Sequence, residues 1–176
     1  MEKIWNHVER SWPAARGDLS VGYRACREKA DELLAGCSIA TVAFSHFGVV
    51  VRSIGEALSV LSATDETAIV DVPAAWVEAY KVRVARFALG AKELEFIEPG
   101  GESFFAEHQR LHGDGLHHVS FQVVNVTSAL QRLSAKGVSL VDQEPRVGSH
   151  GMVAFTAPGI LSPVHLEVFQ TTHSIR

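Results

Sequence analysis

The sequence predicts an α+β fold made of two repeated modules, each a strand followed by a helix and a run of strands, behind a helical extension. Three observations predict it. Apolar residues recur at helical spacing within the first forty positions, and short β-rich runs begin near Thr41. Two helical stretches interrupt these runs, and matching motifs recur 72 residues apart. This repeat favours two half-size modules that share one core or cleft.

Length and composition exclude several classes of protein. The chain has 176 residues, 47% of them hydrophobic, which is enough for a core without disulfide or metal staples and too apolar for a disordered chain. The net charge of −4, with no basic block, argues against binding to nucleic acid or to an anionic membrane. The apolar runs are too short to span a bilayer, and no secretion signal is recognisable. We therefore expect a cytoplasmic protein that binds neither nucleic acid nor a membrane.

The N-terminal extension, residues 1–41, is expected to be helical. Its apolar residues are spaced three and four positions apart, as on one face of a helix: Leu19, Tyr23, Cys26, Ala30 and Leu33. Gly36 is expected to end this helix, and a shorter helix is expected over residues 2–10. Two roles remain open for the extension, which are to cover one side of the modules or to mediate a homodimer.

The rest of the chain divides into short elements. Strands are expected over 42–51, 68–72, 82–89, 93–98, 117–124, 138–141, 152–157 and 164–169, and helices over 54–63 and 126–136. Ser53, three residues before Glu56, and Asn125 are expected helix N-caps, and Gly137 is expected to end the second helix. These elements assign 42–99 to the first module, 100–116 to a linker, 117–170 to the second module and 171–176 to a tail.

Four residues of metal-ligand type occupy equivalent positions in the two modules. His46 and His118 open β-rich runs 72 residues apart, and Glu95 and Glu167 near the module ends are also 72 apart. Strand alternation places every second side chain on one face, so equivalent modules would bring the four together. A single strand histidine is more often a hydrogen-bonded core residue, but here residue type and position both repeat. Two imidazoles and two carboxylates suit one divalent ion, with Co, Mn, Zn, Ni and Fe(II) all open.

The second module also carries a recognisable series of motifs. They are Gly-Asp-Gly-Leu-His-His-Val-Ser-Phe-Gln-Val from Gly113, Lys-Gly-Val from Lys136, Glu-Pro at 144–145 and Gly-Ser-His-Gly from Gly148. Over about residues 44–170 the chain resembles the vicinal-oxygen-chelate superfamily, which includes glyoxalases, bleomycin-resistance proteins and dioxygenases, and within it the methylmalonyl-CoA epimerases. The resemblance implies paired βαβββ modules that form an incomplete barrel around one divalent metal ion. It implies as ligands His46, Glu95, His118 and Glu167.

The function implied by this resemblance is metal-dependent isomerisation. The enzyme would remove a proton α to a carbonyl or thioester, and the metal would stabilise the enolate. Glu167 would then serve as a ligand and as an acid/base group, an acyl-CoA would be the substrate, and a homodimer is expected. Two alternatives remain open, a glyoxalase-like lyase or isomerase acting on another small α-carbonyl compound and a non-catalytic small-molecule binding protein. An Fe(II) dioxygenase would need only two His and one carboxylate as ligands.

The pocket departs from the epimerase pattern. Some epimerases carry a second catalytic Glu on the strand that corresponds to 82–87, and this chain has no carboxylate there. His165 lies two residues before Glu167, so it shares that strand face and is the candidate to supply the missing base, the alternative being a histidine that only packs beside the ligands. Glu93, the equivalent position in the first module, is a weaker pocket candidate that would otherwise be a solvated rim residue.

Two further positions are assigned to the substrate pocket. His150, in the Gly-Ser-His-Gly turn, is expected by resemblance to line the substrate mouth, the alternative being a turn residue on a mobile loop. Arg83, with Arg86 on the same strand, is expected to pair with a carboxylate or phosphate of the substrate, the alternative being a solvated residue on an outer face. His108 is expected at the surface.

Overall fold

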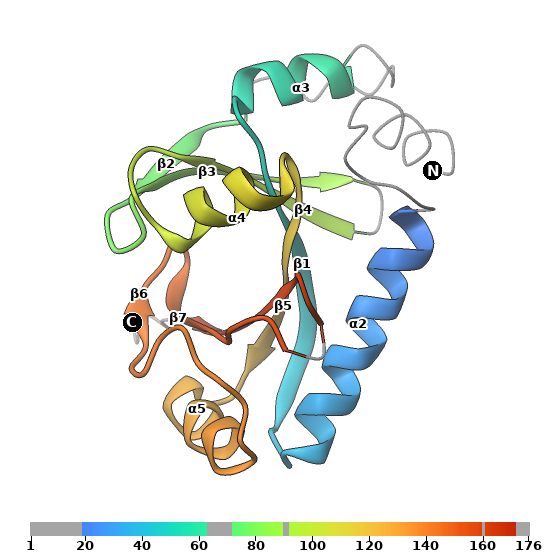
Figure 1. The fold of residues 1–176 in the computed structure, drawn as a ribbon, viewed down its shortest axis with the longest axis vertical. Coiled ribbons are helices and arrows are strands. Elements are labelled where there is room, and N and C mark those ends of the chain that lie inside the picture. Colours follow the sequence, from blue (N-terminus) through green and yellow to red (C-terminus); the bar gives the residue numbers. More distant parts are fainter. Residues whose placement is uncertain (1–18, 63–71, 90–91, 160, 172–176) are drawn as a thin grey trace, which may run out of the picture. The chain divides into compact units, whose positions relative to one another are not determined.

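The structure, a computed structural model, describes residues 19–62, 72–89, 92–159 and 161–171 (Figure 1). Its elements in chain order are α2 (Leu19–Gly36), β1 (Thr41–Val50), α3 (Ile54–Ser62), β2 (Ala74–Val77), β3 (Val82–Leu89), β4 (Lys92–Pro99), α4 (Phe104–His112), β5 (Gly115–Val123), α5 (Val126–Ala135), β6 (Arg146–Val147), β7 (Gly151–Phe155) and β8 (His165–Thr171). The helix expected over 2–10 and nearly all of the strand expected over 68–72 lie outside the described residues.

The element order repeats once along the chain. Strand β1, helix α3 and strands β2, β3 and β4 form one βαβββ series, and β5, α5, β6, β7 and β8 form the second. Helices α3 and α5 begin 72 residues apart, at Ile54 and Val126, which is the offset of the sequence motifs. The predicted mixed fold of two strand–helix–strand modules behind an N-terminal helix is therefore confirmed.

The chain forms two compact units, and β1 and β5 each contribute to both. One unit comprises residues up to Arg24 with Phe47–His117, and the other comprises Ala25–His46 with His118 onward. In the first unit the strand order is β2-β3-β4-β1, with antiparallel β2–β3 and β3–β4 pairs. In the second it is β1-β5-β8-β7-β6, where β5 and β8 run parallel and β7 is antiparallel to both neighbours.

Local sequence signals explain where the module helices begin and end. The Ser53 hydroxyl accepts a hydrogen bond from the Glu56 amide at 3.3 Å, and the Asn125 side chain accepts one from the Ser128 amide at 2.7 Å. Each thus satisfies a backbone donor that the first helical turn leaves without a partner. Gly137, at φ 78°, follows the end of α5 in the left-handed region that glycine adopts without strain. Both expected N-caps and the expected stop at Gly137 are confirmed.

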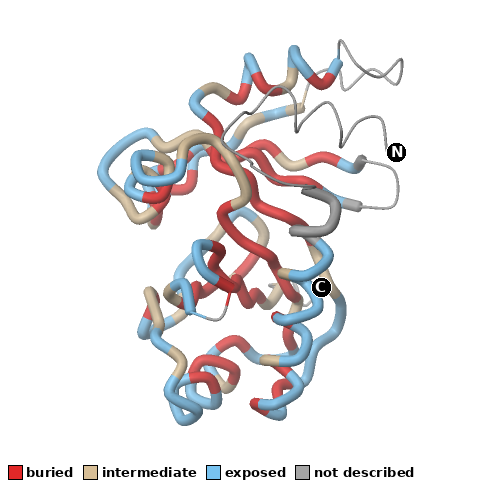
Figure 2. The backbone as a smooth tube through the Cα atoms, turned by 45° about the vertical axis from the view of Figure 1, so that its right-hand side comes forward, coloured by how far each residue is buried: buried red, intermediate tan, exposed pale blue. Residues whose placement is uncertain are grey.

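Each unit buries apolar side chains between its helices and its strands. Figure 2 shows buried residues concentrated along the strands and alternating with exposed residues along the helices. Helix α3 packs on β4, and α5 packs on β7 and β8. In α2 the fully buried side chains are Ala30, as expected, and Leu34, while Leu33 is only partly buried, so the buried position in the last turns is shifted by one residue. Among the described helices, none has the length and apolar character needed to cross a bilayer.

Three elements were not expected from the sequence, and one expected strand is reduced to a single bridge. Helix α4 lies in the segment assigned to a linker, where Ser103 accepts a hydrogen bond from the Ala106 amide and Gly113 caps the other end at φ 77°. Strands β2 and β6 are only four and two residues long. In the segment 138–141, only Leu140 pairs, with Thr156, because this segment runs beside the end of β7.

Candidate metal centre

Three of the four predicted ligands meet inside the second unit. His46 lies near the middle of β1, His118 on β5 and Glu167 on β8, and all three are buried, with the two histidines at 0% and Glu167 at 4% exposure. The parallel pairing of β5 with β8 sets Ser120 opposite Glu167, and His118 lies two residues before Ser120, so His118 and Glu167 share one face of the two strands. Strand alternation therefore places an imidazole and a carboxylate of neighbouring strands close together.

The three donor atoms form a nearly equilateral triangle. His46 Nε2 lies 3.2 Å from His118 Nε2, and each of these nitrogens lies 3.2 Å from Glu167 Oε2. Ligands held about 2.1 Å from one metal ion are separated by roughly 3.0–3.4 Å in octahedral or tetrahedral geometry, so this spacing fits a shared cation. Glu167 Oε2 has no partner with hydrogen-bond geometry, which also fits a carboxylate oxygen directed at a common ion.

Electrostatics favours the ionised carboxylate at this point. Burial acts to raise the pKa of the Glu167 carboxyl, but the attraction of the imidazoles of His118 and His46 outweighs burial and holds that pKa well below its usual range. The carboxylate is therefore available as an anionic ligand at neutral pH. When the two imidazoles are neutral, as metal ligands must be, the buried carboxylate leaves a net negative charge, which a divalent cation would neutralise.

The two histidines are held by different neighbours. Ser45 Oγ lies 3.0 Å from His46 Nδ1, the ring nitrogen that does not face the triangle. The His118 ring instead meets the edge of Phe155, with ring centroids 5.2 Å apart. Sequence reasoning missed Ser45, although its position directly before a predicted ligand was the available signal.

Glu95, the fourth predicted ligand, belongs to the first unit. It lies on β4 at 6% exposure, and the antiparallel register of β3 with β4 places it opposite Arg86. Directly opposite residues of an antiparallel pair share a face, so Glu95, Arg86 and Glu93 lie on one face of this ladder.

Arg83 lies on the other face of the same ladder. Its register partner is Glu98, with which it forms an ion pair at 3.6 Å, and Glu98 also accepts a hydrogen bond from the Ile54 amide at the start of α3. If Glu95 faces the metal, the strand arginine on that side is Arg86 and not Arg83. The register therefore does not support the expectation that Arg83 faces the pocket. Arg83 lies three residues from Arg86, the residue opposite Glu95, so its side chain lies on the other face of the ladder.

His165 has one ring nitrogen fixed by the backbone. It is 5% exposed, and its Nδ1 lies 2.8 Å from the carbonyl oxygen of Thr156. Because a carbonyl oxygen can only accept, Nδ1 carries the hydrogen in this contact and the neutral ring keeps its lone pair on Nε2. His165 therefore has the tautomer that a base or ligand acting through Nε2 requires.

His150 is carried next to the triangle by a tight turn between β6 and β7. Its ring centroid lies 5.8 Å from that of His46 and 5.3 Å from that of Phe169, edge-on in both cases. The Gly148 amide donates to the Gly151 carbonyl oxygen at 2.8 Å, which closes the turn. His150 is partly exposed, so it stands between solvent and the buried His46 ring.

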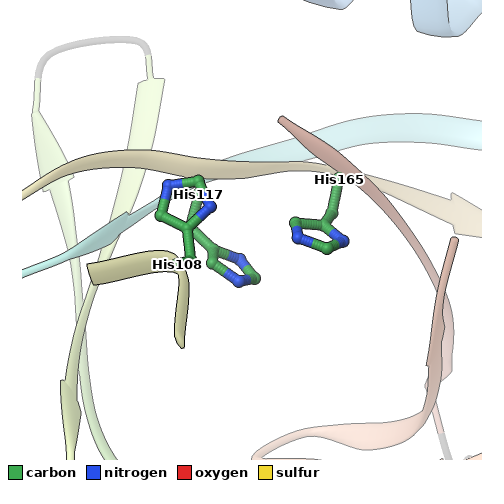
Figure 3. A group of neighbouring side chains, drawn as sticks. All are labelled: His108, His117 and His165. Atoms are coloured by element: carbon green, nitrogen blue, oxygen red, sulfur yellow. The ribbon is translucent and has the colours of Figure 1, made fainter. Parts of the chain in front are cut away.

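The described residues include three further buried histidines, His108, His117 and His165 (Figure 3). His117 points away from His118 by strand alternation and stacks on Phe105 with ring centroids 4.2 Å apart. His108 is 5% exposed and packs edge-on against His117 at 4.7 Å. The expectation of a surface position for His108 was therefore wrong, because α4 was not anticipated.

Two curated proteins are similar to this chain in sequence. The curated proteins include the uncharacterized protein YqjC of Bacillus subtilis, which is 35% identical over 128 residues covering 70% of this chain and 88% of its own. They also include the mitochondrial methylmalonyl-CoA epimerase of Dictyostelium discoideum, which is 28% identical over 79 residues covering 43% of this chain and 48% of its own.

Solved structures share the fold. A variant of Streptomyces coelicolor methylmalonyl-CoA epimerase in complex with 2-nitronate-propionyl-CoA superimposes with a TM-score of 0.66 at 22% identity, over 76% of this chain and 97% of its own. The family model described as the glyoxalase/bleomycin resistance protein/dioxygenase superfamily matches residues 45–155. With its two βαβββ series and its buried histidine–carboxylate triangle, the chain belongs to this superfamily.

Proposed function

We propose that the protein is a metal-dependent isomerase of the epimerase type, which removes and returns the proton α to the carbonyl group of an acyl thioester. The observation that carries this proposal is the buried triangle of His46, His118 and Glu167, whose donor atoms lie 3.2 Å apart. The similarity to methylmalonyl-CoA epimerases in sequence and in fold supports the same reaction type. The substrate class we assign is an acyl-CoA.

The residues that would hold the metal are the triangle and Glu95. Glu95 is supported by its burial and by its position, which in the first module corresponds to that of Glu167 in the second. A divalent cation held by these residues supplies Lewis-acid stabilisation of the negative charge that develops on the substrate oxygen. The ligand set is compatible with Co, Mn, Zn, Ni or Fe(II).

His165 accepts the proton from the substrate, and Glu167 is the second acid/base group. His165 Nδ1 is committed to the Thr156 carbonyl oxygen, so the proton from the substrate is accepted at Nε2. His165 lies on β8 two residues before Glu167. Burial of both side chains excludes bulk water, which keeps the abstracted proton from being lost to solvent.

The test is exchange of the α-proton in deuterated solvent. The protein loaded with Co or Mn is incubated with propionyl-CoA and with methylmalonyl-CoA, and deuterium incorporation is followed by mass spectrometry. We expect exchange and one metal per chain for the wild type, loss of both for His118→Ala, and exchange slowed about 100-fold with metal retained for His165→Gln. His112→Gln, at an exposed histidine of α4, is the matched control and should change neither.

Two outcomes would overturn the proposal. One is a wild-type protein that binds a metal ion but exchanges no α-proton of either thioester. The other is a protein that does not bind one divalent ion per chain, because the triangle would then be a hydrogen-bonded part of the core.

A second function is favoured by one observation. The triangle within the second unit is by itself a two-His, one-carboxylate set, the arrangement of non-haem Fe(II) oxygenases. Oxygen consumption by the Fe(II)-loaded protein with a catechol probe separates the two functions. Consumption that is unaffected by Glu95→Gln would favour oxygenation, because that reaction does not need the fourth protein ligand.

A further inference from the structure

Ser120 carries a buried hydroxyl on the face of the second unit that holds the histidine–carboxylate triangle. It lies on β5 two residues after His118, and the parallel register with β8 sets it opposite Glu167. Side chains two residues apart on a strand, and those paired across neighbouring strands, share a face. Two residues beyond Glu167 on β8, the ring centroid of Phe169 lies 6.5 Å from that of His46. Ser120 therefore lies beside Glu167 on the side of the triangle.

The Ser120 hydroxyl has no hydrogen-bond partner among the described residues. Ser120 is 0% exposed, and neither its Oγ nor Glu167 Oε2, the carboxylate oxygen that faces the two imidazoles, has a contact of hydrogen-bond geometry there. A buried hydroxyl without a partner costs free energy, because it gives up its hydrogen bonds to water and gains none. Two such atoms at directly opposite positions of neighbouring strands therefore call for a common explanation.

The next polar side chain along this face of β5 is already engaged. Gln122, two residues beyond Ser120, donates through its side-chain amide to Thr171 Oγ1 at 3.3 Å. That bond joins β5 to β8 one step further along the same pair of strands. The Ser120 hydroxyl occupies the corresponding place opposite Glu167 and has its hydrogen available.

Metal binding changes which groups can donate to Glu167. A histidine that ligates a metal through Nε2 carries no hydrogen on that nitrogen, so neither His46 nor His118 can donate from Nε2 in the metal-bound chain. A ligating carboxylate is itself usually hydrogen-bonded by a neighbouring group, which fixes its orientation. The Ser120 hydroxyl is available for that role, because it lies on the adjacent strand and is not engaged by the described residues.

We propose that Ser120 is a positioning residue whose hydroxyl donates a hydrogen bond to the Glu167 carboxylate when that carboxylate ligates the metal. The inference rests on the metal site of the proposed function and not on its reaction. Neighbouring strands lie only about 4.8 Å apart, and rotation of the serine side chain between staggered positions moves its oxygen without moving the strand. Ser120 thus acts on metal affinity through Glu167.

The expected signature is a pair of different effects of one substitution. Ser120→Ala removes the hydroxyl and leaves the strand packing almost unchanged. In chelator, where the hydroxyl has no partner to lose, we expect the urea midpoint to stay the same or to rise. In the metal-bound chain the substitution removes a hydrogen bond to a ligand, so the affinity for Co²⁺, measured by optical titration, should fall about 10-fold. The visible absorption bands of bound Co²⁺ should shift as well.

Two substitutions in the same unit serve as controls. Thr156→Val removes a buried hydroxyl that does have a partner, because Thr156 Oγ1 accepts a hydrogen bond from the Leu166 amide at 3.2 Å. It should therefore lower the urea midpoint in chelator, which Ser120→Ala should not. Ser134→Ala, at an exposed position of α5, should leave the Co²⁺ affinity and the absorption bands unchanged.

The proposal is overturned if Ser120→Ala binds Co²⁺ as tightly as the wild type, or if it lowers the urea midpoint of the metal-free protein as Thr156→Val does. Neither result bears on the proposed reaction. A wild type that binds one Co²⁺ per chain through Ser120-dependent affinity, yet exchanges no α-proton, would contradict the reaction and leave the assignment of Ser120 intact. A wild type that binds no divalent ion would overturn both.

Discussion

The orientation of His46 depends on its chain neighbour Ser45. A neutral imidazole that binds a metal through Nε2 carries its hydrogen on Nδ1, and Ser45 Oγ lies 3.0 Å from that nitrogen as the acceptor. Ser45→Ala removes this acceptor without altering a ligand. We expect the affinity for Co²⁺, measured by optical titration, to fall about 10-fold.

The chain offers a matched control for this prediction. Ser149 makes the same contact with the Nδ1 of the residue that follows it, His150, which is not among the ligands we assign. Ser149→Ala should therefore leave Co²⁺ affinity unchanged, and Ser45→Thr should retain it. Equal affinity of Ser45→Ala and wild type would show that packing alone orients the His46 ring.

Glu167 makes the stability of the metal-free protein sensitive to acid. Its pKa in the folded chain lies well below the unfolded value of about 4.3, so its ionisation stabilises the fold fully above that value. This contribution is lost as the pH falls through the lowered folded pKa. We expect the unfolding free energy in chelator, from urea titrations between pH 5 and pH 2, to fall more steeply for wild type than for Glu167→Gln. Parallel slopes would mean that the carboxyl has no lowered pKa.

At the same scale, the sequence was sufficient to predict three side chains that meet and insufficient for the arginines. The motif repeat singled out His46, His118 and Glu167, because a repeated backbone frame places equivalent strand positions in equivalent places. The choice between Arg83 and Arg86 depends on how β3 pairs with β4, and a sequence does not show the register of a hairpin.

The turn between β6 and β7 depends on its second glycine. Gly151 has φ 152°, and a Cβ there would lie 2.2 Å from the Gln170 carbonyl oxygen. Gly151→Ala is expected to cost at least about 2 kcal/mol in urea unfolding, since both the backbone conformation and the close approach oppose a side chain. Gly159→Ala, where nothing lies within 4 Å, should stay within about 0.5 kcal/mol. Similar costs for the two would show that the turn tolerates a side chain.

Elements with a clear apolar periodicity were predictable, and elements without one were not. Strand β3 begins and ends where alternation indicated, at Val82 and Leu89, and α5 follows its predicted cap at Asn125. Helix α4 buries only Phe105 and His108, and β6 has two residues, so neither carries a repeated apolar pattern that stands out in the sequence. Their formation depends on packing against the rest of the chain.

Across the whole molecule, the two modules share one backbone arrangement but differ in the side chains that flank the predicted ligands. The residue before the first ligand histidine is Ser45, which contacts that ring, and its equivalent is His117, which stacks on Phe105 of α4. Glu93 pairs with Arg86, and its equivalent His165 binds a backbone carbonyl. Equivalent backbones thus carry the same pair of predicted ligands, a histidine and a glutamate, while the flanking positions differ, and these positions distinguish this chain from a symmetric pair of modules.

The helical extension is part of the folded molecule. Leu34 of α2 is fully buried, and the guanidinium of Arg27 lies 4.8 Å from the ring centroid of Phe44 on β1. Leu34→Ala is expected to lower the unfolding free energy by about 2–5 kcal/mol, through lost burial and the cavity it leaves. Leu33→Ala, at the partly exposed neighbour, should cost clearly less. Urea unfolding monitored by circular dichroism measures both. If α2 were an appended helix that packs on nothing, the two substitutions would have equal and small effects.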